Sequence, residues 1–438
     1  MSCAFRPPMP APASPFSETP EISPHGICAR ALPQSQAHTW QVLHACDAYE
    51  RISPVVEAES ESGMLPTVVT TGGPLLSAAP PTAAAQISLL RVWNGVRNWR
   101  RVLLDNVGNC ELVHAHCFAA GMAAVRNFPR VVYEIDRFVE DEPNRAAHGR
   151  SWLARSFQAA EQFVISRAAA VVARTPSLRQ ELIRRGAAEE HIFVIPRPVA
   201  LPEPLSADYL AIDSDPTWSG WRQRSGSNSA GTETFSVLSS AMTGSNWQRW
   251  LKDLAGALHS ASRHTGKLMF YLEAEDDLRR EALRQVEDAR PIFEIQVVDQ
   301  WAAAKVLPAC SLVIAGAAAQ AGGTPVENPL ALAALLAGKP LLAADLPCNR
   351  DVTPSGRGCL WFKPANAADL ERRLLFLVSD PGLCAALGAS GARFIRETRS
   401  PLRIAEQYDA VYRYAMQRRR SGKLQTPAVR WQPSQACI

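Results

Sequence analysis

The sequence has no long apolar run and no cysteine motif. Every apolar run stops short of the about 18 residues that a membrane-spanning helix needs, so we expect no transmembrane helix. Arg6 is not followed by an apolar segment, which argues against a signal peptide. The 10 cysteines are scattered from Cys3 to Cys437 without a CxxC pair or a metal-ligand spacing. We therefore expect reduced thiols, no metal centre and a cytoplasmic protein.

The sequence also has little excess of charge of either sign. The net charge is +4, and charged residues make up 20% of the chain. This excess is too small to indicate a nucleic-acid partner. The length of 438 residues allows two domains with separate cores, together with terminal tails.

What the sequence does contain is a repeated alternation of short apolar strands and helices. This alternation predicts an α/β protein with parallel sheets. We expect strands at 40–45, 67–71, 111–115, 131–135, 169–173, 191–196, 235–239, 267–272, 293–298, 311–315, 341–344 and 358–362. We expect helices at 52–61, 87–106, 118–127, 151–166, 177–185, 247–260, 276–287, 301–307, 329–337, 367–379, 381–397 and 401–416.

Two stretches interrupt the alternation. Residues 1–38 are rich in Pro, Ala and Ser, and we expect disorder there. Residues 201–234 are rich in Ser, Gly, Asp and Pro and are too long for a loop within one domain, so we expect an interdomain linker. These stretches predict an N-terminal domain at 39–200, a C-terminal domain at 235–400, a terminal helix at 401–416 and a basic tail at 417–438.

The segment 317–347 combines a glycine loop, a helix, a turn and a strand. Pro329 suits the first turn of a helix, and Gly338 is placed to end it. The residues between them are small or apolar nearly all round, which indicates a buried helix. Its first amides and its dipole would form an anion site, with Glu327 and Asn328 at that end. The alternative is an ordinary core helix.

Several motifs, taken in order, resemble those of retaining glycosyltransferases of the GT-B fold, of the family 4 type. The resemblance extends from about Trp40 to Met416. In the second half it rests on the glycine loop with Glu327, on AGKP at 337–340, on DLP at 345–347 and on NRDV at 349–352. In the first half it rests on LVHAH at 112–116, YEI at 133–135, AAAVVA at 168–173, LRQEL at 178–182 and VIP at 194–196.

This resemblance implies two Rossmann-like parallel-sheet domains that face each other across a cleft, with the C-terminal helix at 401–416 returning to the N-terminal domain. It implies sugar transfer from a nucleotide-sugar donor to a glycan or lipid-linked acceptor, with retention of configuration and without metal or cofactor. Polysaccharide or glycolipid synthesis is the implied pathway, in the cytoplasm or at the inner face of a membrane. The implied catalytic residues are Asp136 and Glu327, the donor-binding residues are Arg249, Glu327, Asn328 and Leu330, and the acceptor-side residues are His116, Glu134 and Arg137.

The chain departs from the family pattern where the donor diphosphate should bind. The loop at 240–246 has neither the Arg nor the Lys of the family, and Arg249 is the nearest basic residue. Counting back from Gly338, Pro325 and Ala333 stand where the family has two glutamates, so that Glu327 can replace only the first. A second hypothesis is therefore a degenerate glycosyltransferase fold that serves as a binding or scaffold subunit.

Each candidate residue also has a purely structural interpretation. His116 could be a strand-end histidine bonded to backbone, and Asp136 could form a surface ion pair with Arg137. Glu134 needs a partner if it faces the core. Glu327 could be a solvated loop carboxylate.

Overall fold

The computed structural model describes residues 41–46, 53–62, 64–70, 89–108, 110–139, 151–199, 234–240, 247–265, 267–274, 293–316 and 327–418. All of them belong to the compact unit Thr39–Ile438. The predicted N-terminal tail, the helix at 276–287, the glycine loop at 322–325 and nearly all of the linker and of the basic tail lie outside these residues.

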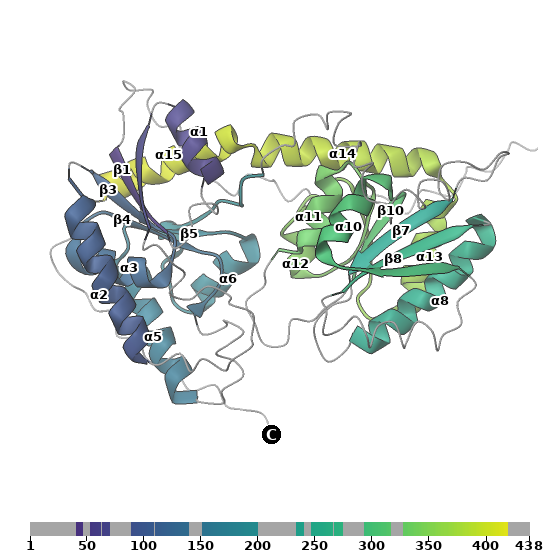
Figure 1. Cartoon of the computed structure of the whole chain (residues 1–438), viewed down its shortest axis with the longest axis horizontal. Coiled ribbons are helices and arrows are strands. Elements are labelled where there is room, and N and C mark those ends of the chain that lie inside the picture. The colour runs from purple at the N-terminus through teal and green to yellow at the C-terminus, as the bar shows by residue number, and fades with distance from the viewer. Residues whose placement is uncertain are drawn as a thin grey trace, which may run out of the picture. The chain divides into compact units, whose positions relative to one another are not determined.

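Six parallel strands form the first sheet in the order β2-β1-β3-β4-β5-β6 (Figure 1). The strands are β1 Gln41–Ala45, β2 Leu65–Val69, β3 Leu112–Ala115, β4 Val131–Ile135, β5 Ala170–Ala173 and β6 Ile192–Val194. The helices of this part are α1 Ser53–Glu61, α2 Leu89–Asn106, α3 Phe118–Asn127, α5 Ser151–Arg167 and α6 Pro176–Arg184.

Six further parallel strands form the second sheet in the order β12-β11-β10-β7-β8-β9. The strands are β7 Phe235–Ser240, β8 Leu268–Glu273, β9 Glu294–Val298, β10 Leu312–Ala315, β11 Leu341–Ala344 and β12 Cys359–Phe362. The helices that follow or connect them are α8 Trp247–Thr265, α10 Gln300–Val306, α11 Pro329–Leu336, α12 Pro347–Arg350, α13 Ala367–Val378, α14 Pro381–Arg399 and α15 Pro401–Gln417.

The expectation of an α/β chain with two parallel sheets is confirmed, and most predicted elements shift by one or two residues. The short helix α12 was not among the predicted elements. Pro347 in fact begins this helix, where its missing N–H leaves no bond unmade. No single described helix is long and apolar enough to cross a membrane, while the bent pair 367–378 and 381–417 meets that requirement jointly.

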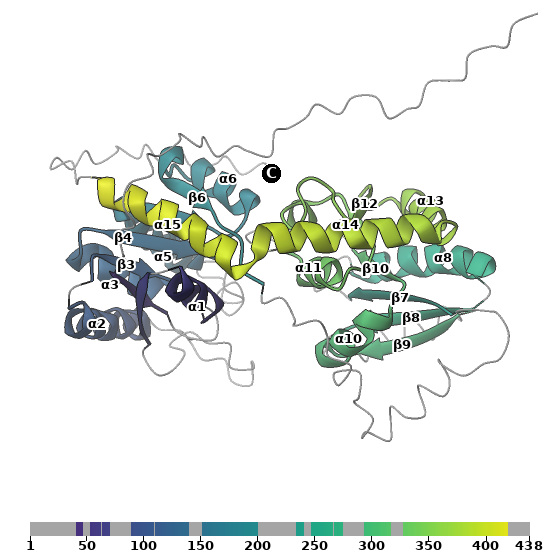
Figure 2. The same cartoon turned by 90° about the horizontal axis from the view of Figure 1, so that it is seen from above.

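The strand residues alternate between two cores on the two faces of the first sheet. Leu43, Val113 and Tyr133 pack with residues of α2, α3 and α5 on one face. Val42, Leu112, Val132 and Val172 pack on the other face, with residues of α1 and of the C-terminal helix α15. Figures 1 and 2 show α15 in yellow, lying across this sheet. The last helix of the described chain therefore completes the core that the first strands begin.

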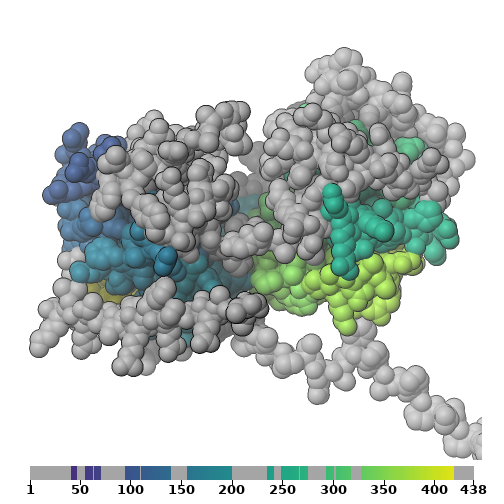
Figure 3. Space-filling model, turned by 90° about the horizontal axis from the view of Figure 1, so that it is seen from below, coloured from purple at the N-terminus to yellow at the C-terminus, as the bar shows by residue number. Residues whose placement is uncertain are grey.

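The second sheet is covered in the same manner. On one face α8 and α13 pack side by side, as Figure 3 shows in green and yellow-green. Trp250 of α8 stacks on Phe362 with ring centroids 6.0 Å apart. A Cβ atom at Gly316 would lie 2.4 Å from the Trp250 ring, so only glycine fits at this position without a shift.

The opposite face of the second sheet carries α10, α11 and α14. Helix α14 lies close to the turn that ends α11, because Gly388 has no side chain. A Cβ atom at Gly388 would lie 2.0 Å from the carbonyl oxygen of Gly338. Gly338 itself has φ +66°, the left-handed conformation expected for the residue that ends this helix.

Candidate functional site

Polar side chains replace apolar ones at the carboxyl ends of the strands, on the face of the first sheet that α15 covers. In β3 the inward series continues from Leu112 to His114 and His116, and in β4 it continues from Val132 to Glu134. The strand pairing sets His44 of β1 beside His114. Open parallel sheets bind ligands at this edge, which makes the cluster a candidate site.

Glu134 is the centre of this cluster and is 5% exposed. Its Oε1 is paired with Arg174, which follows β5, and its Oε2 accepts a 2.5 Å hydrogen bond from the hydroxyl of Tyr408 in α15. Burial alone would raise the pKa of this carboxyl, but Arg174 and His116 hold it well below the usual range. Glu134 is therefore a buried carboxylate, and the partner that the sequence analysis required for it is Arg174.

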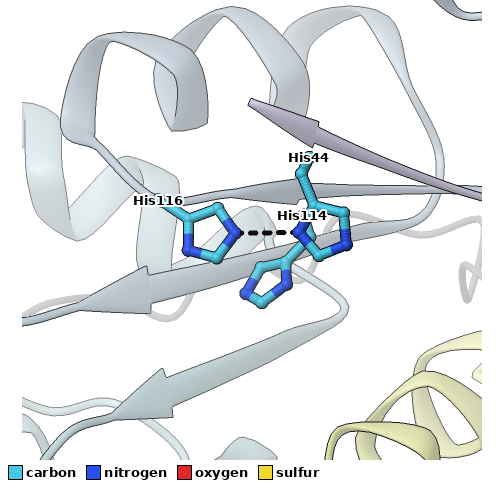
Figure 4. A group of neighbouring side chains, drawn as sticks. All are labelled: His44, His114 and His116. Carbon is cyan, nitrogen blue, oxygen red and sulfur yellow. Dashed lines mark hydrogen bonds between the residues drawn. The ribbon is translucent and has the colours of Figure 1, made fainter. Parts of the chain in front are cut away.

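Three histidines lie next to one another in this cluster (Figure 4), and two of them, His114 and His116, adjoin Glu134. The Nδ1 atom of His44 lies 3.0 Å from Nε2 of His116, and the Nδ1 atom of His116 lies 3.2 Å from Oε1 of Glu134. His114 is fully buried, and burial together with His116 lowers its pKa well below the usual range, so its ring is neutral. His116 contacts other side chains, and the alternative of a side chain bonded to backbone is not observed.

Two tyrosines of α15 close the cluster from the side of the helix. Tyr412 donates to Oε1 of Glu59 at 2.8 Å, and its oxygen lies 2.9 Å from Nδ1 of His114. The hydroxyl of Tyr408 lies 3.0 Å from Nη1 of Arg174. Burial raises the pKa of both hydroxyls well above the usual range, and each therefore keeps its proton.

Asp136 stands at the outer edge of the cluster and keeps 36% of its side chain exposed. Arg174 donates to it through Nε at 3.0 Å, and Arg197 forms a second pair with it. The expected surface pair of Asp136 with Arg137 is wrong, because the carboxylate of Asp136 binds Arg174 and Arg197 instead. Arg137 itself is exposed.

A second polar group lies at the start of α11. Arg399 of α14 binds Glu327 through two hydrogen bonds, Nη1 to Oε2 at 2.9 Å and Nη2 to Oε1 at 2.5 Å. Only 12% of the Glu327 side chain and 3% of the Arg399 side chain are exposed. The interpretation of Glu327 as a solvated loop carboxylate is therefore wrong.

The first amides of α11 are not free. The side chain of Asn328 accepts hydrogen bonds from the amides of Leu330 and Ala331, at 3.1 and 3.3 Å. The side-chain amide of Asn328 donates to Asn349, which donates in turn to the carbonyl of Ala344. The expected open anion site at this helix end is wrong, because the N-cap side chain uses the donors that an anion would need.

Asp351 lies near this pair and accepts two hydrogen bonds at Oδ1 from Ser177, from the amide at 3.1 Å and from the hydroxyl at 2.9 Å. Burial is the main reason why its pKa rises from 3.8 to about 6, and Glu327 adds to this rise. Arg249, the predicted replacement for the diphosphate-binding lysine, is exposed on α8 with its Nε 4.0 Å from Asp253.

The structure thus brings His116, Glu134 and Asp136 together at one sheet edge and sets Glu327, Asn328 and Leu330 at one helix end. Sequence reasoning missed Arg174, Arg197, Arg399 and Tyr408, which bind the carboxylates of these residues. It also missed Glu59 and Tyr412, which bind each other and the histidines His44 and His114. Tyr408 and Tyr412 are four residues apart, which places them on one face of a helix, but this spacing does not indicate that their hydroxyls meet carboxylates.

Comparison with known proteins gives a family match and a shared fold. Residues 57–202 match the sequence model of Glycosyltransferase Family 4. No curated protein sequence matches the chain.

Three solved structures are similar over most of this chain. A glycosyltransferase from Rickettsia africae ESF-5 superposes with a TM-score of 0.58 at 12% identity, covering 87% of this chain and 100% of its own. HepE from Anabaena, solved with UDP and glucose, gives 0.53 at 14% identity over 85% and 99% of the two chains. Sucrose-phosphate synthase from Thermosynechococcus elongatus gives 0.55 at 14% identity over 85% and 98%. At these identities the likeness establishes the fold alone, which is GT-B.

Proposed function

We propose that this chain, a glycosyltransferase of the GT-B type by its family match and its fold, moves a sugar from a nucleotide-sugar donor to a glycan or lipid-linked acceptor. The transfer retains the anomeric configuration and uses no metal ion or cofactor. The product belongs to a polysaccharide or glycolipid, and the protein works in the cytoplasm, with peripheral association at a membrane surface and no nucleic-acid partner.

One observation carries this proposal. The segment that resembles a donor site holds a carboxylate, Glu327, in a fixed position at the start of α11, bound by Arg399. Each carboxylate oxygen has two lone pairs, so both can still accept a hydrogen bond from a donor hydroxyl. The binding of UDP and glucose by HepE supports a nucleotide-sugar donor for the same fold.

The proposal gives each of the other predicted residues a different role. Asn328 and Leu330 act through the cap that fixes the start of α11, and Arg249 meets the donor diphosphate. Asp136 is the partly exposed carboxylate of the first-sheet cluster and is the second catalytic candidate. Arg137 is exposed beside it, whereas the side chains of His116 and Glu134 are each only 4% exposed and support the acceptor side.

A second candidate function is supported by a specific observation. The amides of α11 are capped by Asn328, and the guanidinium of Arg399 is paired with Glu327. A nucleotide-sugar diphosphate carries two negative charges that need compensation in a desolvated site. Because these hydrogen-bond donors already have partners within the protein, they favour a non-catalytic binding or scaffold subunit of a polysaccharide pathway.

A calorimetric screen of nucleoside diphosphates and nucleotide sugars separates the two functions, followed by transfer assays with the donors that bind. Release of the nucleoside diphosphate together with a glycosylated acceptor supports the enzyme, and proton NMR of the new anomeric centre tests retention. Binding of a glycan without donor binding or turnover supports the scaffold.

A further inference from the structure

The three histidines of the first-sheet cluster form a set whose geometry the proposed sugar transfer does not explain. One ring nitrogen can be chosen from each of His44, His114 and His116 so that all three atoms lie within 4.8 Å of one another. The ring centroids are 4.0 to 5.3 Å apart. His44 and His114 are fully buried, and only 4% of the His116 side chain is exposed.

In His44 and His114, one ring nitrogen is hydrogen-bonded to a residue outside the three histidines. Nε2 of His44 lies 2.7 Å from Oε2 of Glu59, and a carboxylate only accepts, so this nitrogen carries the proton. Tyr412 uses its own proton on Glu59, and its oxygen therefore accepts from Nδ1 of His114. In the neutral rings Nδ1 of His44 and Nε2 of His114 are consequently bare lone pairs.

A neutral His116 ring cannot satisfy both of its neighbours. If its proton is on Nε2, the bare Nδ1 faces Oε1 of Glu134 at 3.2 Å. If its proton is on Nδ1, the bare Nε2 faces the bare Nδ1 of His44 at 3.0 Å. Either tautomer of the neutral ring sets two acceptors against each other.

A buried acceptor at His114 remains unsatisfied as well. Its Nε2 has no hydrogen-bond donor among the described residues, and Oε2 of Glu134, itself an acceptor, lies 3.4 Å away. Leaving a buried acceptor unsatisfied destabilises the folded protein. A single cation between the rings would remove every one of these conflicts.

We propose that His44, His114 and His116 bind a divalent transition metal ion of the zinc class, through Nδ1 of His44 and Nε2 of the other two. Imidazole nitrogen is a preferred ligand of zinc. The ion holds the strands β1 and β3 together, and sugar transfer does not use it.

The surroundings match what metal-binding histidines require. Such a histidine usually donates its other ring N–H to a carboxylate or another acceptor, which fixes the ring. Glu59 accepts the second ring N–H of His44, and Tyr412 accepts that of His114. Glu134 lies next to the second ring nitrogen of His116. Two buried carboxyl groups, Glu59 and Glu134, adjoin the rings against one buried guanidinium, Arg174, and a cation reduces this imbalance.

Binding must draw the rings together. Two nitrogen ligands of a tetrahedral zinc ion are about 3.3 Å apart, which follows from zinc–nitrogen bonds of about 2.0–2.1 Å. His44 and His116 already meet this spacing at 3.0 Å. His114 supplies the remaining movement, and a non-protein ligand completes the tetrahedron.

The experiment uses the full chain without an affinity tag, because polyhistidine tags bind the same metals. We expect about one zinc per chain by mass spectrometry after dialysis against metal-free buffer. Replacing zinc by cobalt should produce the intense visible absorption of a tetrahedral cobalt(II) site. Chelation should lower the melting temperature, and stoichiometric zinc should restore it. A chain that retains no zinc and gives no cobalt absorption overturns the proposal and leaves protons as the shared cations.

Two variants locate the ion without depending on one substitution. His116→Gln removes one ligand and keeps the side chain's size, and it should abolish the cobalt absorption. Tyr412→Phe keeps all three ligands but removes the acceptor of His114, so zinc affinity should fall about 10- to 100-fold. His264→Gln, on an exposed histidine of α8, is the matched control and should bind metal as the native chain does. Unchanged metal binding in both cluster variants would place the ion elsewhere.

Discussion

Arg399 of α14 holds both carboxylate oxygens of Glu327, 72 residues earlier in the chain. The same guanidinium also lies 3.4 Å from the backbone oxygens of Asp351 and Val352. Because Arg399 is 3% exposed, Glu327 supplies the counter-charge that its buried guanidinium needs. The pair fixes the start of α11 and is therefore a structural element as well as a candidate donor contact.

Glu327→Gln should destabilise the protein by about 3 kcal/mol, because it leaves a buried guanidinium without its counter-charge. Urea unfolding should show the loss as a lower midpoint with an unchanged slope. The control is Asp345→Asn, which breaks the pair of Asp345 with Arg350, two side chains that are 45% and 42% exposed. The control should lose less than about 1 kcal/mol. Equal losses in the two variants would contradict the importance of burial here.

The same Glu327→Gln variant should lose activity if the enzyme proposal is right. Turnover should fall by about 10- to 1000-fold, which corresponds to about 1.4–4 kcal/mol of transition-state stabilisation. The assay is run at a temperature at which circular dichroism shows both forms folded, with Asp345→Asn as the reference. The scaffold alternative predicts no change, and equal rates in a clearly active preparation would remove Glu327 from the site.

Nucleotide-sugar binding without acceptor should be weak, with a dissociation constant in the high micromolar range. Each missing charge-assisted contact to the diphosphate costs roughly 1.5–3 kcal/mol, a factor of about 10 to 100 in affinity. Arg249→Ala should weaken this binding further, whereas Arg263→Ala, near the other end of α8, should not. Calorimetry that yields a low-micromolar constant for the native chain would show that a cation of the diphosphate site had been overlooked.

The alternation of strands and helices could be predicted from the sequence, because most of the described strands are short and mainly apolar. The sequence also predicted that Glu134 needs a partner, because a carboxylate within a mainly apolar strand faces a core. The partner itself was not predicted, because an arginine after the strand at 170–173 looks like any other strand-end cation.

The start of α11 shows the opposite situation. Asn328 directly before Pro329 is a readable N-cap signal, and a capped helix end has few donors left for an anion. The expectation of an anion site neglected this competition. The pairing of Glu327 with Arg399 could not be read in this way, because it depends on how α14 packs against α11.

Asp351→Asn should stabilise the protein above pH 6. Burial raises the pKa of Asp351 to about 6, so its protonated form is favoured in the folded chain. Stability from this group is fully present below pH 3.8 and is lost as the pH rises through about 6. The variant cannot ionise, and its advantage in melting temperature should grow between pH 4 and 8.

Asp345→Asn is the control with the opposite sign. The hydrogen bonds from Arg350 hold the pKa of Asp345 below its usual value. Its native carboxylate therefore stabilises the fold at neutral pH and loses this effect as the pH falls. Melting curves at several pH values should move the two variants in opposite directions relative to the native chain, and parallel shifts would contradict the assignment for Asp351.

Gly388→Ala should destabilise the chain by more than about 2 kcal/mol, because the added methyl group would lie 2.0 Å from a backbone oxygen of the turn after α11. Gly256→Ala is the matched helical control, with no atom within 4 Å of the added carbon. It should raise stability by about 0.5–1 kcal/mol through better helix formation. Thermal unfolding of both variants measures the difference, and a neutral Gly388→Ala would mean that α14 moves away freely.

The hydrogen bond between Tyr412 and Glu59 joins residues 353 positions apart in the sequence. While the chain is being synthesised, the polypeptide emerging from the ribosome thus carries a sheet with one face uncovered, and with carboxylates that lack their tyrosine donors. Domains usually fold as units during synthesis, and exposed apolar surface invites aggregation in the meantime. For this protein the first sheet therefore keeps one uncovered apolar face until α15 has been synthesised.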